Sequence, residues 1–466
     1  MQTQPYQAKY KIRIVTAASL FDGHDAAINV MRRIIQASGA EVIHLGHNRS
    51  AADIVNAAIQ EDAQAIAITS YQGGHLEFFK YMYDLLHEQH CGHIMLFGGG
   101  GGTILPEEIA ELQAYGIKKI YAPDDGRALG LQGMINHLLQ TCDYDTLQHQ
   151  TPNAQGINTT NYKQIAQLIT LAENQNEQLK NILPITTKTV PVIGISGTGG
   201  AGKSSVTDEI VRRYLTTFTD KTIAVLSVDP SKKKTGGALL GDRIRMNAIH
   251  HPRAYMRSMA TRDNDKSLSK HISDAIDVCK AAGFDLILLE SSGIGQSDTS
   301  IVAYCDVPMY VMTPEYGAAS QLEKIGMLDY AKLICMNKMD KGGALDALHD
   351  VKKQYKRNHL LFDTPDELLP IVGTMASKFN DEGMNSFFTL LINITAQTTG
   401  CSWLALDPTL TLQNSSIQTM IIPPNRIRYL AEITETIQTY NTHVQQQAAI
   451  ATALYQLEGT IKLLKK

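Results

Sequence analysis

The sequence has no run of apolar residues that approaches the ~20 needed to span a bilayer. Its first residues, MQTQPYQAKYKIRIV, also lack the charged-then-apolar pattern of a secretory signal. The six cysteines are scattered and include no Cys-x-x-Cys pair, which argues against a disulfide framework or a zinc site and fits a reducing compartment. We therefore expect a cytoplasmic protein that does not act in a membrane.

A strong charge of one sign is also absent. The net charge is −4 at pH 7, so no basic field points to nucleic acid as a partner. The hydrophobic content of 44% and the charged content of 19% have the balance of a globular protein. A chain of 466 residues is too long for one ordinary core, so two or three domains are expected.

The first 141 residues alternate short apolar runs with longer amphipathic stretches such as AAINVMRRIIQASG. Strands that alternate with helices in this way predict a parallel sheet with helices on both faces, and five strands suit a flavodoxin-like, or Rossmann-like, α/β domain. The predicted strands are residues 11–19, 41–46, 65–71, 93–99 and 119–123.

Residues 142–188 are rich in Gln, Asn and Thr and are interpreted as a linker with one helix near 161–182. A second α/β domain is expected over 189–400, with strands near residues 189–197, 222–229, 284–291, 307–314 and 331–338. Residues 401–466 form a helical linker in this interpretation, helical over roughly forty residues, against about 11–12 for the average helix. A helix of this length cannot bury its apolar stripe alone, so we expect a partner domain or a homodimer.

Residues Gly197–Ser204 fit the phosphate-loop pattern and lie between a strand, VIGIS, and a helix, SSVTDEIVRRYL. The glycines let backbone N–H groups surround phosphate oxygens, Lys203 would neutralise β- and γ-phosphate charge, and the Ser204 hydroxyl would ligate Mg²⁺. The alternative, a chance glycine-rich turn, does not explain the flanking strand and helix. The expected nucleotide-binding residues of this loop are Gly197, Gly200, Ala201, Gly202, Lys203, Ser204 and Ser205.

A second nucleotide motif, Asn337-Lys338-Met339-Asp340, follows another predicted strand. Its carboxylate can accept hydrogen bonds from both guanine N1–H and the 2-amino group, which adenine lacks. The motif is common by chance, but its place downstream of a phosphate loop favours GTP over ATP.

Three acidic residues complete the predicted nucleotide site. Asp229 and Glu290 end predicted strands, and Asp242 lies in the glycine-rich segment TGGALLGDRIRM. Acidic residues at strand ends near a phosphate loop are the usual Mg²⁺ ligands or their hydrogen-bond partners. The alternative for each is a helix cap or a solvated loop charge.

Residues 190–400 resemble the metallochaperone-type GTPases that accompany acyl-CoA mutases. The resemblance rests on SGTGGAGKSS, VDPS, GDRIRM, ESSGIGQSD, NKMDKGGALDAL and ASKFND. It implies GTP hydrolysis to GDP, with Arg245 near the phosphates, Gln296 in a switch, and Ala376 and Ser377 beside the guanine. Ser291 stands where relatives often carry Thr, and it keeps the hydroxyl expected near Mg²⁺. Candidates for an arginine finger are Arg243, Arg245 and Arg262, each of which could equally be an ordinary surface cation.

Asp22-Gly23-His24 follows the first predicted strand, at the place where cobalamin-binding domains carry Asp-x-His-x-x-Gly. Alone, such a histidine is most often a loop residue or a helix cap. The resemblance implies that His24 is the lower axial ligand of cobalt, with Asp22 accepting the other ring N–H. Ala27 replaces the usual motif glycine, and FDGHDAAINVMRRI matches a subgroup that carries Ala there.

Two further features of the first domain support this resemblance. Ser70 ends the third predicted strand, where the family uses a serine to meet the nucleotide tail, although Gln72 replaces the usual Leu. The run Gly98–Gly102, with Gly98 and Gly99 as the expected contacts, leaves room for a flat ligand against the backbone, and no structural need explains so many glycines. All lie at the carboxyl edge of the predicted sheet, where ligands bind.

The order of domains resembles the N-terminal half of fused isobutyryl-CoA mutases, including IPPNRIRYLAEI at the entry to the helical segment. The acyl-CoA-binding barrel of that family is absent. The resemblance implies adenosylcobalamin, Mg²⁺ and GTP as ligands, a mutase barrel as partner, and a GTPase that controls cofactor loading. Carbon-skeleton isomerisation would then require the barrel.

Two other hypotheses stay open. The chain could be a cobalamin-binding regulator or carrier whose GTPase works with no mutase partner. Alternatively, the first domain could be a degenerate flavodoxin-like module, with only the GTPase active.

Overall fold

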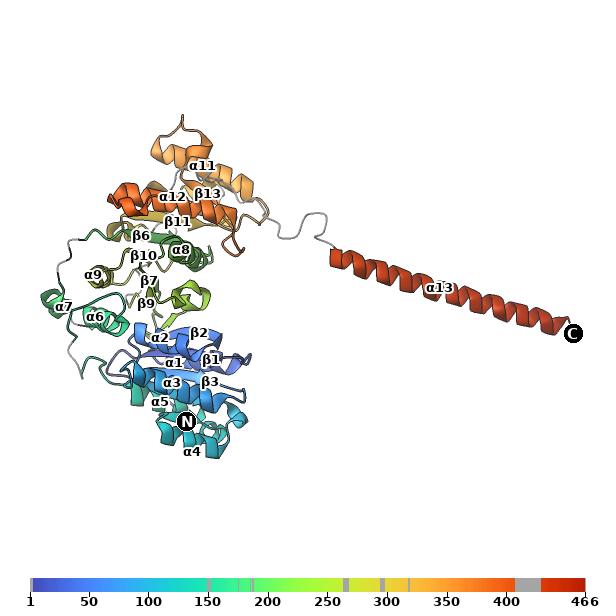
Figure 1. Ribbon diagram of the computed structural model, residues 1–466, viewed down its shortest axis with the longest axis horizontal. Helices are drawn as coiled ribbons and strands as arrows, with labels where there is room; N and C mark the ends of the chain where they lie inside the picture. Colours follow the sequence, from blue (N-terminus) through green and yellow to red (C-terminus); the bar gives the residue numbers. More distant parts are fainter. Residues whose placement is uncertain are drawn as a thin grey trace. The chain divides into compact units, whose positions relative to one another are not determined.

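The computed structural model describes residues 3–148, 152–174, 176–184, 186, 188–262, 268–293, 298–316, 319–406 and 429–465. The chain divides into two compact units, residues 1–416 and residues 417–466, which are described separately. The first unit contains two parallel sheets with helices on both faces of each (Figure 1). The predicted α/β class is therefore confirmed.

The first sheet has the strand order β5-β4-β3-β1-β2-β8. Without β8, this is the flavodoxin-like order 2-1-3-4-5. The five predicted strands are confirmed as β1 (Arg13–Ser19), β2 (Glu41–Arg49), β3 (Ala65–Thr69), β4 (Met95–Gly99) and β5 (Lys119–Tyr121).

Two apolar layers sandwich this sheet. One layer contains residues of α2, α3 and α4, and the other contains residues of α1 and α5. The strands are apolar on both faces because helices cover both, as expected for a parallel sheet. The helices are α1 (Ala26–Ala37), α2 (Ala51–Gln60), α3 (His75–Glu88), α4 (Pro106–Tyr115) and α5 (Pro123–Cys142).

The second sheet has the order β13-β12-β11-β6-β10-β7-β9, and its paired strands are parallel. The five strands predicted from the sequence are confirmed as β6 (Val192–Gly197), β7 (Ile223–Asp229), β10 (Leu286–Glu290), β11 (Val307–Met312) and β12 (Leu333–Met336). The sequence analysis missed β9 (Ala254–Ala260) and β13 (Ile371–Gly373) at the two edges of this sheet.

Helices cover both faces of the second sheet. Residues of α8 and α12 pack on one face, whereas residues of α6, α9 and α11 pack on the other. The helices of this domain that follow the phosphate loop are α8 (Lys203–Thr217), α9 (Ile272–Ala282), α10 (Ala319–Leu322), α11 (Ala344–His359) and α12 (Glu382–Thr399).

The segment predicted as a linker contains two helices, α6 (Tyr162–Asn174) and α7 (Asn176–Ile182), where one was expected. Ile165, Leu168 and Ile169 of α6 are fully buried in the core beneath the second sheet. The helix α6 is therefore an integral part of the second domain's packing.

The strand β8 (Ala238–Leu240) belongs by sequence to the second domain but pairs in parallel with β2 of the first sheet. The register places Glu41 opposite Ala238 and Ile43 opposite Leu240. Both Ala238 and Leu240 are buried in the core that β1, β2, β3 and α2 form. The two domains therefore share one sheet, which the sequence analysis did not predict.

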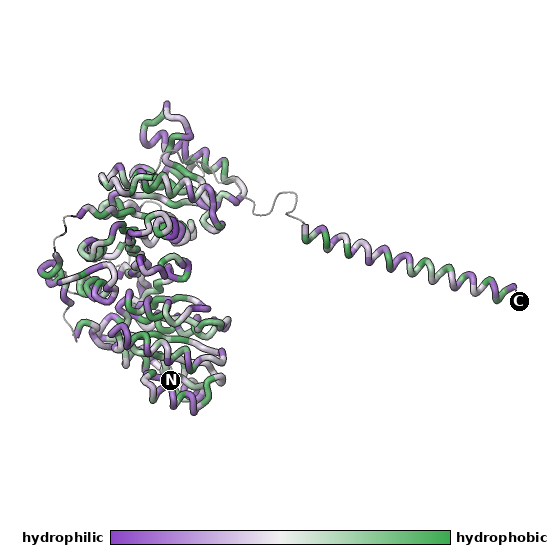
Figure 2. The backbone as a smooth tube through the Cα atoms, in the orientation of Figure 1, coloured by the Kyte–Doolittle hydropathy of each residue, from purple (hydrophilic) through white to green (hydrophobic). Residues whose placement is uncertain are grey.

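The second unit contains the helix α13 (Tyr429–Leu464), which confirms the long C-terminal helix. Hydrophobic and hydrophilic stretches alternate along it (Figure 2). Its large apolar side chains are exposed, among them Leu430, Ile433, Ile437 and Leu454. None of the helices in the described ranges is long and apolar enough to cross a membrane.

Truncation of Leu240 tests whether β8 is part of the first domain's core. Because Leu240 is fully buried, Leu240→Ala should cost about 2–5 kcal/mol through lost contacts and the cavity left behind. Its neighbour Leu239 is only partly buried, so Leu239→Ala is the matched control and should cost less. Scanning calorimetry of both variants measures the difference, and equal melting temperatures would contradict the shared core.

Candidate functional site

The phosphate loop connects β6 to α8 at the carboxyl edge of the second sheet. Gly200 and Gly202 have φ angles of +77° and +95°, in the left-handed region that favours glycine. The Lys203 side chain curls back over the loop, and its Nζ donates to the Gly197 carbonyl at 3.0 Å. Burial lowers the pKa of Lys203 below its ordinary value, although Glu290 and Asp242 act in the opposite direction. The Lys203 ammonium group therefore lies over the loop, where it can pair with an anionic ligand.

Two of the three predicted carboxylates converge on Ser204. The Ser204 hydroxyl lies 3.1 Å from Asp242 Oδ1 and 2.9 Å from Glu290 Oε1. Thr207 and Ser227, which the sequence analysis did not single out, donate to the remaining oxygens of Glu290 and Asp242 respectively. Their position beside the carboxylates appears only in the tertiary structure, because neither belongs to a motif.

The third carboxylate, Asp229, ends β7 and accepts a hydrogen bond from the Gly241 N–H at 3.0 Å. Burial raises the pKa of Asp229 to about 8, and the nearby Asp242 adds to the rise. The same two causes raise the pKa of Glu290 to about 8. Carboxylates buried close together disfavour ionisation unless a cation joins them.

Within the described residues, no group of three or more His, Cys, Asp and Glu side chains is arranged to hold a metal ion by itself. Mg²⁺ usually takes one or two protein ligands and completes its octahedron with water and substrate phosphates. The Ser204 hydroxyl beside Asp242 and Glu290 supplies oxygen donors of the required kind. Ser291, in contrast, is buried and contacts Ser196 at 3.3 Å.

The Asn337–Asp340 motif lies against the phosphate loop. Asn337 Nδ2 donates to the Ala201 carbonyl at 2.9 Å, and Lys338 Nζ donates to the Gly200 carbonyl at 2.7 Å. The Asn337 side-chain oxygen accepts the Ala376 N–H at 3.1 Å. Asn337 therefore joins three segments that are distant in sequence: the phosphate loop, the end of β12 and the loop that carries Ser377.

The outer residues of the motif face solvent. Asp340 and Ser377 are exposed, and Met339 is half-buried with its N–H bonded to the Thr374 carbonyl. An exposed carboxylate at the end of a rigid loop is free to accept hydrogen bonds from a base. Ser205 lies in the first turn of α8, as expected.

The three candidate arginine fingers differ in exposure. Arg245 is exposed in the 3₁₀ helix η2 (Asp242–Arg245). Arg243 is buried, and Arg262 is bound to Glu41 at 2.8 Å. Arg243 and Arg262 are therefore not surface cations. Gln296 lies outside the described residues.

The second candidate site lies at the carboxyl edge of the first sheet. Asp22 is buried, and its Oδ1 lies 2.9 Å from His24 Nδ1 and accepts the His24 N–H at the same distance. Its Oδ2 accepts the Tyr71 N–H at 2.6 Å. Burial alone would raise the pKa of Asp22, but these hydrogen bonds lower it overall, so the carboxylate stays ionised.

The His24 side chain is 75% exposed although Asp22 fixes its Nδ1. With the proton on Nδ1, the Nε2 lone pair faces outward and is available to a metal. Ser70 is fully buried, and its Oγ accepts a hydrogen bond from Ser19 at 2.9 Å. The structure thus brings His24, Asp22 and Ser70 to one edge, as predicted from strand order.

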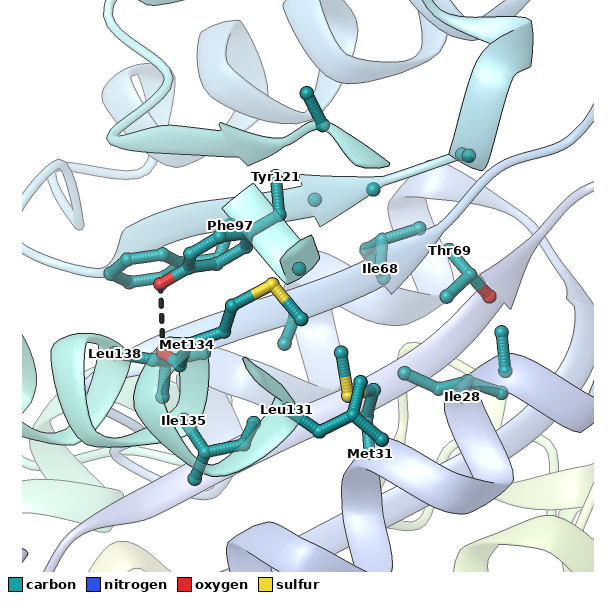
Figure 3. Close-up of a pocket in the computed structure, with 18 of the residues that line it drawn as sticks. Ile28, Met31, Ile68, Thr69, Phe97, Tyr121, Leu131, Met134, Ile135 and Leu138 are labelled. Carbon is teal, nitrogen blue, oxygen red and sulfur yellow. Dashed lines mark hydrogen bonds between the residues drawn. The ribbon is translucent and has the colours of Figure 1, made fainter. Parts of the chain in front are cut away.

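An apolar cavity of about 260 Å³ opens beside this edge, between β3 and β4 and the helices α1 and α5 (Figure 3). Gly98 and Gly99 form part of its wall, and Tyr121 closes one side with its hydroxyl bonded to the Met134 carbonyl at 3.2 Å. The Thr69 hydroxyl is buried at the cavity and has no hydrogen-bond partner among the described residues. An apolar slot with one unsatisfied polar group suits the insertion of a largely flat ligand.

Packing accounts for part of the glycine run, contrary to our expectation that no structural need explains it. A Cβ at Gly98 would lie 2.4 Å from the Phe79 ring, and one at Gly100 would lie 2.1 Å from the Ser70 carbonyl. Gly99 and Gly102 have no such clash. Gly101 also lines the cavity and has a φ of +56°, which favours glycine. Within the run, Gly99 therefore lines the cavity without a close overlap or a left-handed backbone that would require glycine.

Two protein-family models match this chain, one over each α/β domain. The family model described as "Methylmalonyl Co-A mutase-associated GTPase MeaB" matches residues 165–400, and the "B12 binding domain" model matches residues 12–126. The fused isobutyryl-CoA mutase of Geobacillus kaustophilus is 54% identical over 99% of this chain and 43% of its own length. That of Cupriavidus metallidurans is 51% identical over 98% of this chain and 42% of its own length. The chain therefore spans about two fifths of these homologous relatives.

Alanine substitution separates the glycines needed for packing from the others. Gly100→Ala should cost about 1–3 kcal/mol, because its methyl group would overlap the Ser70 carbonyl. Gly102→Ala meets nothing within 4 Å and should leave stability unchanged. Thermal unfolding of the two variants measures the effect, and an unchanged melting temperature for Gly100→Ala would contradict the close approach.

Proposed function

The chain belongs to the family of methylmalonyl-CoA mutase-associated GTPases, and on that premise we propose that it hydrolyses GTP and holds adenosylcobalamin as the chaperone and cofactor-binding portion of an isobutyryl-CoA-type mutase. The observation that carries the proposal is the presence of two built sites in one compact unit. One is the phosphate loop with Lys203, Ser204 and their carboxylates, and the other is His24 on Asp22 beside an apolar cavity.

In the nucleotide site, the loop N–H groups and Lys203 would bind the phosphates of GTP, and Ser204 with Asp242 and Glu290 would hold Mg²⁺. Asp229 holds Gly241, and with it the start of η2, by accepting the Gly241 N–H. Arg245 supplies positive charge from η2, on the phosphate side of the site. Phosphoryl-transfer sites stabilise developing charge with groups held in place in this way. Gln296 completes the proposed catalytic set as a switch residue.

At the guanine end, Asp340 accepts the two base donors while Asn337 and Lys338 brace the phosphate loop. Met339 and the Ala376–Ser377 backbone flank the base. In this arrangement, loops that hydrogen-bond to one another bind both the guanine base and the phosphates.

In the first domain, His24 Nε2 would ligate the cobalt of the cofactor, and Asp22 holds the imidazole in the tautomer that leaves Nε2 unprotonated. The cavity wall, which includes Gly99, Phe97 and Leu138, would exclude water from the nucleotide tail of the cofactor, and Thr69 offers a polar contact in the cavity. Ser70 is the second proposed polar contact of the tail. When bound, adenosylcobalamin supplies the radical for carbon-skeleton rearrangement. The residues of this chain bind and orient the cofactor, and the isomerase reaction belongs to a complex with the barrel.

The proposed partner is the acyl-CoA-binding barrel of a mutase, as a domain or a separate subunit. Its support is the 43% coverage of a fused isobutyryl-CoA mutase together with the exposed apolar side chains of α13. The same helix supports a homodimer. A cobalamin-dependent regulator or carrier with no mutase partner is the alternative, and co-purification with a barrel subunit distinguishes the two.

Replacement of the proposed cobalt ligand tests the cofactor assignment. His24→Ala should weaken adenosylcobalamin binding by about tenfold or more and should change the visible spectrum of the bound cofactor, because the axial nitrogen is lost. The measurement is an absorption titration with the purified chain, followed by desalting. His349→Ala removes an exposed histidine of α11 and is the control. A wild-type chain that changes no spectrum and retains no cofactor would refute the cobalamin assignment.

Base selection tests the role of Asp340. Asp340→Asn should bind GTP at least about tenfold more weakly, because hydrogen bonds to a charged acceptor contribute roughly 1.5–3 kcal/mol. The amide N–H₂ can donate to the C2 carbonyl of xanthine, so affinity for XTP should rise. Competition binding of GTP, ATP and XTP measures the change, with Asp363→Asn on an exposed loop as control. Unaltered selectivity in Asp340→Asn would place guanine recognition elsewhere.

A further inference from the structure

The segment Asp229–Met246, here called the connector, leaves the nucleotide site and returns to it by way of the other domain. Its first residue, Asp229, and its later residue, Asp242, both lie in the nucleotide site. Between them, β8 pairs with β2, and the Ala238 N–H donates to the Ala40 carbonyl at 3.2 Å. Asp242 therefore follows within two residues of an edge strand of the first sheet.

Successive residues of η2 bond to groups of the two domains. Asp242 bonds to Ser204 and Ser227 of the second domain. The next residue, Arg243, is buried, and its Nε donates to Glu61 Oε1 at 2.7 Å while its NH2 donates to Gln60 Oε1 at 3.0 Å. Glu61 follows α2 of the first domain and is fully buried. The NH2 of Arg243 also donates to the Met256 carbonyl of β9 in the second domain at 2.5 Å, so Arg243 ties the first domain to the second immediately beside a proposed cation ligand.

A second contact holds the same turn. Arg49, at the end of β2, donates from NH2 to the Ile244 carbonyl at 3.0 Å and from Nε to the Leu45 carbonyl at 2.8 Å. The Ile244 side chain packs near Gly46 of the same strand: a Cβ added at Gly46 would lie 3.8 Å from it. Three consecutive residues, 242 to 244, are therefore held by the nucleotide site, by Glu61 and by Arg49.

The electrostatics of Glu61 make this contact specific. Burial alone would raise the pKa of Glu61, but Arg243, Arg13 and Arg257 hold it below its ordinary value. Arg13 bonds to Glu61 Oε2 at 2.5 Å, and the Ser258 N–H donates to Oε1 at 3.0 Å. A buried charge without water as an alternative partner tolerates few arrangements of its counter-ions, so it fixes geometry more than it adds stability.

We propose that Glu61 and Arg243 are positioning residues of the GTPase: through them, together with Arg49, the cobalamin-binding domain places Asp242 for the Mg²⁺–nucleotide complex. This inference rests on the proposed GTP site and assigns residues of the first domain to it. The nucleotide site is then incomplete without the first domain.

The test compares the Mg²⁺ requirement for nucleotide binding among full-length variants. Glu61→Gln and Arg243→Lys should each raise the Mg²⁺ concentration for half-maximal retention of a fluorescent GDP analogue by about tenfold or more, the effect expected when a partner of a metal ligand is lost. Excess Mg²⁺ should restore GTP turnover in both. Glu173→Gln is the matched control because the Glu173 side chain is also buried and charged and pairs with Arg257 at 3.0 Å, with Arg262 and, at 3.9 Å, with Arg13, whereas the ion pair of Arg243 is with Glu61. It should bind Mg²⁺ and GDP like the wild type.

The inference is overturned if Glu61→Gln and Arg243→Lys keep the wild-type Mg²⁺ requirement, or if Glu173→Gln shifts equally. If either variant with a broken buried ion pair fails to fold, Arg49→Ala decides the question, since it removes the Ile244 contact from a half-exposed position. A raised Mg²⁺ requirement in Arg49→Ala supports positioning, and a wild-type requirement overturns it. A wild-type chain that binds no guanine nucleotide overturns the proposed GTPase and this inference together, whereas normal wild-type binding with unaffected variants overturns the inference alone.

Discussion

The parallel pairing of β8 with β2 is the constraint on which the arrangement of both sites depends. It places a strand of the nucleotide-binding domain in the sheet that carries Asp22 and His24. The surrounding interface is unusually rich in buried charge, with Arg13, Glu41, Glu61, Glu173 and Arg257 all removed from solvent. Among them, Arg13 contacts Glu41 at 2.9 Å and Glu61 at 2.5 Å. Because burying such charges costs much of their mutual attraction, the network specifies one way of joining the domains more than it stabilises either domain.

The two sites use the same architecture for opposite chemistry. Each lies at the carboxyl ends of parallel strands, where loops converge and backbone groups point outward. The first domain places an exposed imidazole beside an apolar cavity, which suits a large and partly flat cofactor. The second domain concentrates an ammonium group, hydroxyls and carboxylates around a loop of N–H donors, which suits a polyphosphate with its cation. Fold class alone would not distinguish these functions, and the side chains at the strand ends do.

The relationship to the fused isobutyryl-CoA mutases covers only part of the length of those proteins. It shares the cobalamin-binding and GTPase regions with relatives more than twice the length that it covers. The helix α13 presents apolar side chains along its length, from Leu430 to Leu464. In our proposal these regions load and hold the cofactor, whereas the barrel recognises the substrate thioester.

The sequence by itself determined the features that depend on neighbouring residues. Periodicity and strand punctuation identified β1 to β5 and the principal strands of the second sheet, and the spacing of Gly197–Ser204 and Asn337–Asp340 identified the nucleotide motifs. The predicted strand order also placed Asp22, His24 and Ser70 at one edge of the first sheet, because the carboxyl ends of parallel strands lie on the same side. These properties are local, or follow from strand order, so they can be read along the chain.

The tertiary structure alone decided the features that depend on distant partners. The three residues of β8 have no alternation of their own, and they form a strand because β2 offers an open edge. Arg243 looks like a surface cation in sequence, yet Glu61, 182 positions away, makes its burial favourable. Thr207 and Ser227 likewise belong to the nucleotide site only because the fold places Glu290 beside Thr207 and Asp242 beside Ser227. A side chain's type fixes what it can bond, but its burial and charge partner are set by which distant residue the fold brings opposite it.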